Sequence, residues 1–178
     1  IMGGIGGAFL LPNSADNARL LAEGKLSLAN GAHIVTNEFY NNFINLTGSG
    51  ITIGLVIFTL VGAKSVQFKS IGKVELVPAL FNINEPFLFG LPLVMNPWLA
   101  IPFFLTPVVV ALSTYFVIKF GIVPPTGVAA PWTTPAVISG FFIGGWKMAL
   151  WQACVLAIST AIYWPFAAKY DKYLKEQE

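Results

Sequence analysis

Long uncharged apolar runs alternate with short polar segments along the chain. The runs Leu46–Ala63, Leu99–Ile118 and Met148–Ala168 have 18, 20 and 21 residues and contain no charged side chain. A membrane-spanning helix needs about 20 consecutive apolar residues, so this pattern predicts three spanning helices. The apolar residues 1–12 fit the end of a fourth span, and we therefore expect the sequence to be a piece of a longer membrane protein.

The composition agrees with a membrane protein. Of the 178 residues, 56% are hydrophobic and 10% are charged, whereas soluble domains carry about 25% charged residues. The net charge is +2 and the cationic residues are scattered, so nucleic-acid binding is not expected. A single cysteine excludes a disulfide scaffold, and one histidine gives no basis for a metal site. No cofactor is expected either.

The lysines predict an orientation in the membrane. Lys64, Lys69 and Lys73 lie in one short segment, and three more lysines lie in the tail from residue 169. Because short cytoplasmic loops are enriched in Lys and Arg, both segments are predicted to face the cytoplasm. The number of crossings between them must then be even. Two apolar segments, 76–98 and 121–137, are therefore predicted to enter and leave on the same side, as re-entrant hairpins.

The whole pattern predicts an all-α integral membrane fold of transmembrane helices and two proline-rich re-entrant hairpins. Ten of the twelve prolines lie between Pro78 and Pro135, and we expect them to break the helices there, because each removes a backbone donor. Broken backbone at membrane depth is tolerated where it is buried in protein or lines a watery cavity, so this region predicts a cavity. The expected order is the end of a truncated span (1–12), a polar loop and amphipathic segment (13–45), a span (46–63), a cytoplasmic loop (64–75), a re-entrant hairpin (76–98), a span (99–120), a re-entrant segment (121–137), a span (138–168) and a cytoplasmic tail (169–178).

Glu85 is the strongest candidate for chemistry. It lies inside the proline-rich region with Asn82 and Asn84 beside it, ten residues from the nearest other charge. An ionisable group at such a place in a membrane protein is a functional candidate by default. One carboxylate among uncharged hydrogen-bonding groups suits a polyhydroxyl ligand such as a sugar. The alternative is a structural carboxylate that caps broken backbone.

A second candidate is the segment Pro131–Pro135, in which Trp132 is followed by Thr133 and Thr134. An aromatic face flanked by hydroxyl groups can stack on a sugar ring and bind its hydroxyls. A tryptophan at the membrane interface gives the same local pattern, because such tryptophans are common. The sequence leaves both readings of Trp132 open.

Several of these motifs together resemble one known family. The family is the membrane-spanning IIC component of the bacterial sugar phosphotransferase system (PTS), in its lactose/cellobiose/diacetylchitobiose permease class. The resemblance covers about residues 31–175 and rests on Asn82-Ile83-Asn84-Glu85-Pro86, Phe89-Gly90-Leu91-Pro92, Asn96-Pro97, Pro124-Pro125, Pro131-Trp132-Thr133-Thr134-Pro135, Ile34-Val35-Thr36 and Gly48-Ser49-Gly50.

This resemblance implies the C-terminal transport domain of a permease for a disaccharide such as cellobiose, lactose or diacetylchitobiose. Glu85 would hydrogen-bond the sugar, orient the hydroxyl that becomes phosphorylated and could accept its proton. Asn84, Asn82, Trp132 and Thr133 would line the same pocket. The phosphate would come from a cysteine on a separate IIB protein or domain, with IIB and IIA as cytoplasmic partners. A homodimer in the bacterial cell membrane is expected, with its interface in an N-terminal half that lies outside this sequence.

One position departs from the family pattern. The family usually has a Gly-Ile-His-Gly-like motif whose histidine touches the sugar, and the matching stretch here, Gly4 to Gly7, has Gly6 in place of that histidine. An alternative function is an ion-coupled secondary transporter with Glu85 as the coupling site. A proton relay needs a chain of protonatable groups, and Glu85 is the only carboxylate in the proline-rich region. A membrane scaffold that transports nothing would have no need of broken helices.

Overall fold

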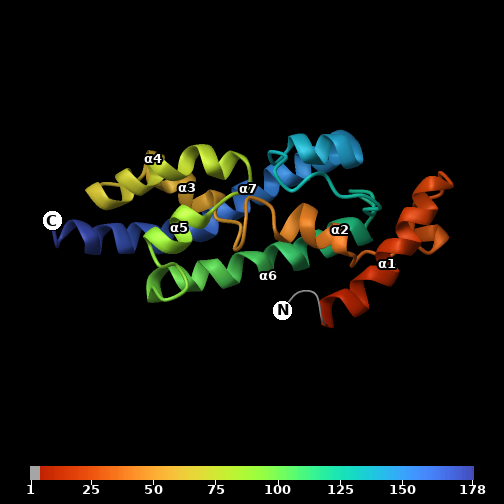
Figure 1. Cartoon of the computed structure of the whole chain (residues 1–178), viewed down its shortest axis with the longest axis horizontal. Coiled ribbons are helices and arrows are strands. Elements are labelled where there is room, and N and C mark those ends of the chain that lie inside the picture. The colour runs from red at the N-terminus through yellow and green to blue at the C-terminus, as the bar shows by residue number, and fades with distance from the viewer. Residues whose placement is uncertain (1–4) are drawn as a thin grey trace.

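The chain folds into an elongated assembly of helices arranged along one long helix, α7 (Figure 1). The computed structural model describes residues 5–178, with side chains from Leu10 onward. No strand occurs in this part of the chain, and the predicted all-α fold is confirmed. In chain order the elements are α1 (Ile5–Ala22), the 3-10 turn η1 (Leu28–Asn30), α2 (Asn37–Phe39), the π-helix η2 (Tyr40–Ile44), α3 (Ile53–Val61), α4 (Val66–Leu80), α5 (Glu85–Gly90), α6 (Pro97–Lys119) and α7 (Ile138–Lys175).

Two of the described helices, α6 and α7, are long and apolar enough to cross a membrane. α6 covers residues 99–119 of the span predicted over 99–120, whereas the span predicted over 138–168 is interrupted near its start. α7 consists of two helical pieces that meet at a kink, where Gly144 and Gly145 leave helical geometry and Gly145 has a φ of 71°. Residues 169–175 of the predicted cytoplasmic tail continue α7, because its buried face carries on through Asp171 and Leu174, and the cytoplasmic placement of the tail stays a prediction.

The apolar run 46–63 does not form the spanning helix that its hydropathy predicts. Thr47, Gly48, Gly50 and Ile51 all have positive φ, and the helix begins only at Ile53. α3 has nine residues, which gives a length of about 14 Å against a hydrocarbon core of about 30 Å. The run is apolar because much of it is buried in protein. A buried non-helical segment and a membrane-spanning helix have the same apolar composition, so the sequence pattern does not separate them.

The segment 64–75, predicted as a loop, is mostly helical because α4 begins within it. The Ser65 hydroxyl caps this helix by accepting a hydrogen bond from the backbone N–H of Phe68. Of the lysines that favoured a loop, Lys69 and Lys73 lie on the exposed face of α4, and Lys64 is exposed just before the helix. Its opposite face forms a buried stripe at helical spacing, made of Phe68, Gly72, Glu75 and Ala79.

The loop predicted from residue 13 is helical as far as Ala22, since α1 continues through Pro12. The buried Asn17 explains how a polar helix packs here. Its side-chain amide donates to the carbonyls of His33 and Thr126 at 2.8 Å each and accepts from the His33 N–H. Gly6 lies in the first turn of α1, and Gly4 lies outside the described residues.

The prolines of the broken region act in two ways. Pro86 and Pro97 stand in the first turns of α5 and α6, where a missing backbone donor costs little. Pro102 and Pro107 lie inside α6, which stays a continuous helix, so the expectation that they break it is wrong. Residues 121–137 form no helix. The re-entrant path of this segment and of 76–98 stays a prediction.

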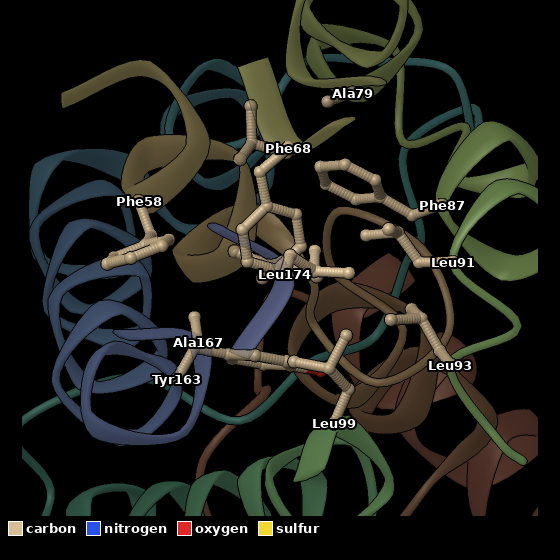
Figure 2. Close-up of a cluster of buried hydrophobic side chains, with 12 residues drawn as sticks. Phe58, Phe68, Ala79, Phe87, Leu91, Leu93, Leu99, Tyr163, Ala167 and Leu174 are labelled. Atoms are coloured by element: carbon tan, nitrogen blue, oxygen red, sulfur yellow. The ribbon is translucent and has the colours of Figure 1, made fainter. Parts of the chain in front are cut away.

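Two apolar clusters hold the helices on α7. One joins α3, α4 and α5 to the C-terminal half of α7, and Figure 2 shows the rings of Phe68 and Phe87 and the side chain of Leu174 converging in it. Phe58 and Phe68 meet edge to face with ring centroids 5.9 Å apart. The other cluster, which includes Phe43 and Met148, joins η2 and α6 to the middle of α7. α7 is therefore the common support of the irregular segments.

Candidate functional site

A buried glutamine on α7 holds the non-helical backbone together. The side-chain oxygen of Gln152 accepts hydrogen bonds from the backbone N–H groups of Val137 (2.8 Å) and Gly140 (2.9 Å) and from the Ser139 hydroxyl (3.2 Å). Its amide nitrogen donates to the Asn42 carbonyl at 3.0 Å. Val137 has a φ of 71°, which is strained for a β-branched residue. Gln152 thus fixes this strained turn against the π-helix η2.

Side chains of the same helix also form hydrogen bonds with the backbone of the irregular segment before α3. The Ser159 hydroxyl donates to the Ile51 carbonyl and accepts from the Gly54 N–H, and the Tyr163 hydroxyl donates to the Gly50 carbonyl at 2.9 Å. A Cβ at Gly54 would lie 2.5 Å from the Ser159 backbone, so α3 and α7 are in close contact here. Non-helical backbone at membrane depth requires internal partners of this kind. The broken segments are therefore held in fixed positions.

Asn82 connects three of these segments. It has a φ of 62°, and its side-chain oxygen accepts from the Thr47 N–H at 3.0 Å. Its amide nitrogen donates to the carbonyls of Trp132 (2.6 Å) and Thr134 (2.8 Å). Asparagine tolerates the left-handed conformation better than other non-glycine residues, which explains its use at this turn. Asn82 thereby positions Trp132.

A cavity of about 280 Å³ opens beside this junction. Its wall combines amide and hydroxyl side chains with three apolar residues and Trp132, which is 69% exposed, and none of its residues is charged. An uncharged wall that combines hydrogen-bonding side chains with apolar and aromatic surface suits a neutral, hydroxyl-rich ligand. The lining residues are Asn41, Asn42, Asn45, Leu46, Asn82, Ala130, Pro131, Trp132, Thr134 and Ser139.

The sequence reasoning missed three asparagines of this cavity. Asn41, Asn42 and Asn45 come from η2 and the residue after it. Single π-helical turns are frequent at functional sites, but a π-helix leaves no reliable sequence signal. The available signal was the density of asparagine in this short stretch, next to the Gly48-Ser49-Gly50 motif.

The structure gathers only some of the predicted site residues around this cavity. Asn82 and Trp132 line it, whereas Glu85 is exposed at the start of α5 and Thr133 is exposed outside the wall. Asn84 is buried, and its amide nitrogen donates to the Ser49 carbonyl (2.7 Å) and the Thr52 hydroxyl (3.0 Å). Only the side-chain oxygen of Asn84 remains for a ligand. Glu85 thus lies three residues from Asn82 along the chain but outside the cavity lining.

Glu75 is a further ionisable group close to Glu85, and the sequence reasoning gave it no role. It lies on the buried stripe of α4 and is 0% exposed. Neither carboxylate oxygen has a hydrogen-bond partner among the described residues. Burial raises the pKa of Glu75 to about 7; the nearby Phe87 N–H opposes the rise, and the charge of Glu85 adds to it. Its helical spacing to Phe68 and Ala79 was the signal that could have identified it as buried.

We expect the free energy of unfolding to fall by on the order of 2 kcal/mol as the pH rises from about 4.5 through 7, because of Glu75. The folded protein binds the proton of Glu75 more tightly than the unfolded chain in this interval, so raising the pH favours unfolding. Glu75→Gln should remove most of this dependence and stabilise the protein at pH 8. The measurement is unfolding in detergent at several pH values. Glu23→Gln, at an exposed site, is the control, and an unchanged pH profile in Glu75→Gln would contradict the assignment.

Comparison with known proteins identifies the family. Residues 1–107 match the family model described as "Phosphotransferase system, EIIC", which is more than half of the chain. The chain belongs to the phosphotransferase-system EIIC family. The resemblance inferred from the Asn82–Pro86 motif is thereby confirmed, and with it the membrane character of the protein.

Curated EIIC proteins align over most of the chain. The lichenan permease IIC component of Bacillus subtilis (strain 168) is 43% identical over 148 residues, which are 82% of this chain and 33% of that protein. The cellobiose-specific EIIC component of Geobacillus stearothermophilus is 39% identical over 181 residues, covering 100% of this chain and 40% of that protein. The chain therefore spans about a third to two fifths of the length of these EIIC relatives.

A solved structure confirms the EIIC fold. The crystal structure of the transporter ChbC, the IIC component of the N,N'-diacetylchitobiose-specific phosphotransferase system, matches with a TM-score of 0.90 and 35% identity. The match covers 98% of this chain and 40% of ChbC. These EIIC relatives do not favour the ion-coupled secondary transporter considered from the sequence.

Proposed function

We propose that this chain is the sugar-binding and translocating part of a PTS permease. In this proposal it imports a disaccharide such as cellobiose, lactose or diacetylchitobiose, which is phosphorylated on delivery. The observation that carries the proposal is the uncharged cavity of asparagines, hydroxyl groups and Trp132, found in a chain of the EIIC family. Amides and hydroxyls exchange hydrogen bonds with sugar hydroxyls, and an indole face packs on the C–H groups of a pyranose ring.

Glu85 has a separate role in this proposal. Its exposed carboxylate at the start of α5 would accept a hydrogen bond from the sugar hydroxyl that becomes phosphorylated. That hydroxyl would attack the phosphorus of a cysteine phosphate on IIB, the sulfur–phosphorus bond would break, and Glu85 would take the hydroxyl proton as general base. Asn84 would contribute its free side-chain oxygen, and Thr133 a hydroxyl at the edge of the site.

The partners follow from the same proposal. The cytoplasmic IIB and IIA components would supply the phosphate, and an N-terminal region of the permease would carry the homodimer interface. The protein would be a multi-pass protein of the bacterial cell membrane, with α6 and α7 among its spans. This domain would move relative to that region and carry the bound sugar across.

Trp132→Ala is expected to weaken cellobiose binding by the full-length protein roughly tenfold, because loss of an aromatic contact costs about 1 kcal/mol or more. Trp132→Phe should keep most of the affinity, since a smaller aromatic face remains. Titration calorimetry measures both. Trp146→Ala, at another exposed tryptophan outside the cavity, is the matched control. Equal affinities for Trp132→Ala and the wild type would refute the role of this cavity.

A further inference from the structure

A second, larger cavity lies at the C-terminal end of α7, away from the Trp132 cavity. Its volume is about 530 Å³, within the range of small-molecule sites. It lies where the end of α3 and the α3–α4 connection meet the last turns of α7, at the end of the molecule marked C in Figure 1. The lining residues are Phe58, Gly62, Lys64, Trp164, Ala168, Asp171, Lys172 and Lys175.

The charge of this cavity is positive and mostly unbalanced. It contains three lysines and one carboxylate, that of Asp171. The Asp171 carboxylate is already occupied, because it accepts from the backbone N–H groups of Lys64 (2.8 Å) and Ser65 (2.9 Å) and from the Ser65 hydroxyl (2.7 Å). Lys172 lies 3.9 Å from Glu176, an exposed pair of little strength. Lys64 and Lys175 have no ion pair within the described residues, so the cavity favours an anion.

The position of the cavity along α7 corresponds to the surface of the membrane. The uncharged stretch from Met148 to Ala168 is about 30 Å long as a helix, which matches the hydrocarbon thickness. Lys172 and Lys175 lie about 6 and 10 Å beyond its end. Trp164 lies one turn before its end, where interfacial tryptophans are found. The lysines are therefore at the depth of lipid phosphates.

Half of the residues that line the cavity are apolar. The rings of Phe58 and Trp164 pack edge to face with centroids 5.2 Å apart, and Gly62 and Ala168 leave room beside them. A free inorganic anion would gain nothing from these apolar residues. A molecule with an anionic head and an apolar body would use both the lysines and the half-exposed Trp164 ring. Basic pockets between helices at the membrane surface bind anionic lipid headgroups in this way.

We propose that this cavity binds an anionic phospholipid of the surrounding bilayer. The ammonium groups of Lys64, Lys172 and Lys175 contact its phosphate, and Trp164, which is 40% exposed, packs on its glycerol and upper acyl carbons with the buried Phe58 ring behind it. Bound there, the lipid joins the α3–α4 connection to the end of α7. The site is independent of the sugar cavity and of the function proposed for it.

The test uses the full-length protein in neutral detergent micelles and phosphatidylglycerol with brominated acyl chains, which quench nearby tryptophans. We expect a saturable component of quenching that Trp164→Phe removes and that is weaker by tenfold or more with brominated phosphatidylcholine. Replacing Lys64, Lys172 and Lys175 with Gln should reduce the affinity for phosphatidylglycerol at least tenfold. Replacing Lys69, Lys73 and Lys119, three lysines outside the cavity, should leave it within twofold. Sugar binding checks that each variant is folded. If the triple variant does not fold, the single charge reversal Lys175→Glu, at an exposed position, replaces it.

Four outcomes would overturn the proposal. If both triple-lysine variants lost the same affinity for phosphatidylglycerol, the lipid would be bound by the general positive charge of the protein and not by this cavity. Displacement of the lipid by inorganic phosphate at the lipid's own concentration would mean a simple anion site. Equal quenching in Trp164→Phe and wild type would place the lipid elsewhere. If the variant with Gln at Lys64, Lys172 and Lys175 bound the lipid normally but bound IIB more weakly, these lysines would be a protein-docking surface.

Discussion

Glu85→Gln is expected to reduce cellobiose uptake and phosphorylation by the full-length protein roughly 100-fold. Gln keeps the size of the side chain but removes the charge that strengthens a hydrogen bond from a sugar hydroxyl and the base that takes its proton, a loss of about 2 to 3 kcal/mol. Glu85 is exposed at the start of α5 and makes no ion pair in the described part of the chain, so the variant should fold normally. Uptake of labelled sugar into vesicles loaded with phosphorylated IIB is the measurement.

Glu176→Gln provides the matched control for this experiment. Glu176 is an exposed carboxylate at the end of α7, far along the chain from the Asn82–Pro86 motif, and uptake should not change when it is replaced. Binding and phosphorylation are measured separately in both variants. If Glu85→Gln lost phosphorylation but bound the sugar normally, Glu85 would act as the general base and would not contribute to sugar binding. Unchanged uptake would exclude Glu85 from the sugar site altogether.

Gln152→Leu is expected to have the largest effect on stability, about 4 kcal/mol. Leucine matches the volume but leaves the N–H groups of Val137 and Gly140 and the carbonyl of Asn42 buried without partners, and each such group costs about 1 to 3 kcal/mol. For a chain of this size such a loss corresponds to a midpoint roughly 10 °C lower. Tryptophan fluorescence during heating in detergent gives the midpoint, and the loss of the turn at Val137 should also abolish sugar binding.

Two further variants make the interpretation of Gln152→Leu specific. Gln152→Glu keeps the accepting oxygen for Val137 and Gly140 and loses only the donor to Asn42, so its midpoint should fall between those of wild type and Gln152→Leu. Gln67→Leu, at an exposed position on α4, should leave the midpoint within about 1 °C. If Gln152→Leu melts like the wild type, the amide does not hold the two segments together.

Some helices of this chain could be predicted from the sequence and others could not, for physical reasons. α6 was predictable because a long uncharged run without glycine forms a helix in any apolar surrounding. The run 46–63 was equally apolar, but the hydrogen bonds that Ser159 and Tyr163 offer to the Ile51 and Gly50 carbonyls satisfy a non-helical path there. Those partners lie more than 100 residues away, so no local pattern could reveal them. The lysines of α4 favoured a loop where the structure has a helix, because one charged face does not prevent a helix from forming.

The sequence by itself determined the class of this protein: an all-helical membrane protein, the Asn82–Pro86 motif that pointed to the EIIC family, and Asn82 and Trp132 as candidates for one site. These features depend on local composition and spacing, which the chain carries in any conformation. Only the tertiary structure decided which asparagines complete the cavity wall, that Asn82 positions Trp132 through its backbone carbonyl, and that Glu75 is buried near Glu85. Each of these depends on contacts between distant segments, because α7 supplies the hydrogen bonds that let broken backbone replace regular helices.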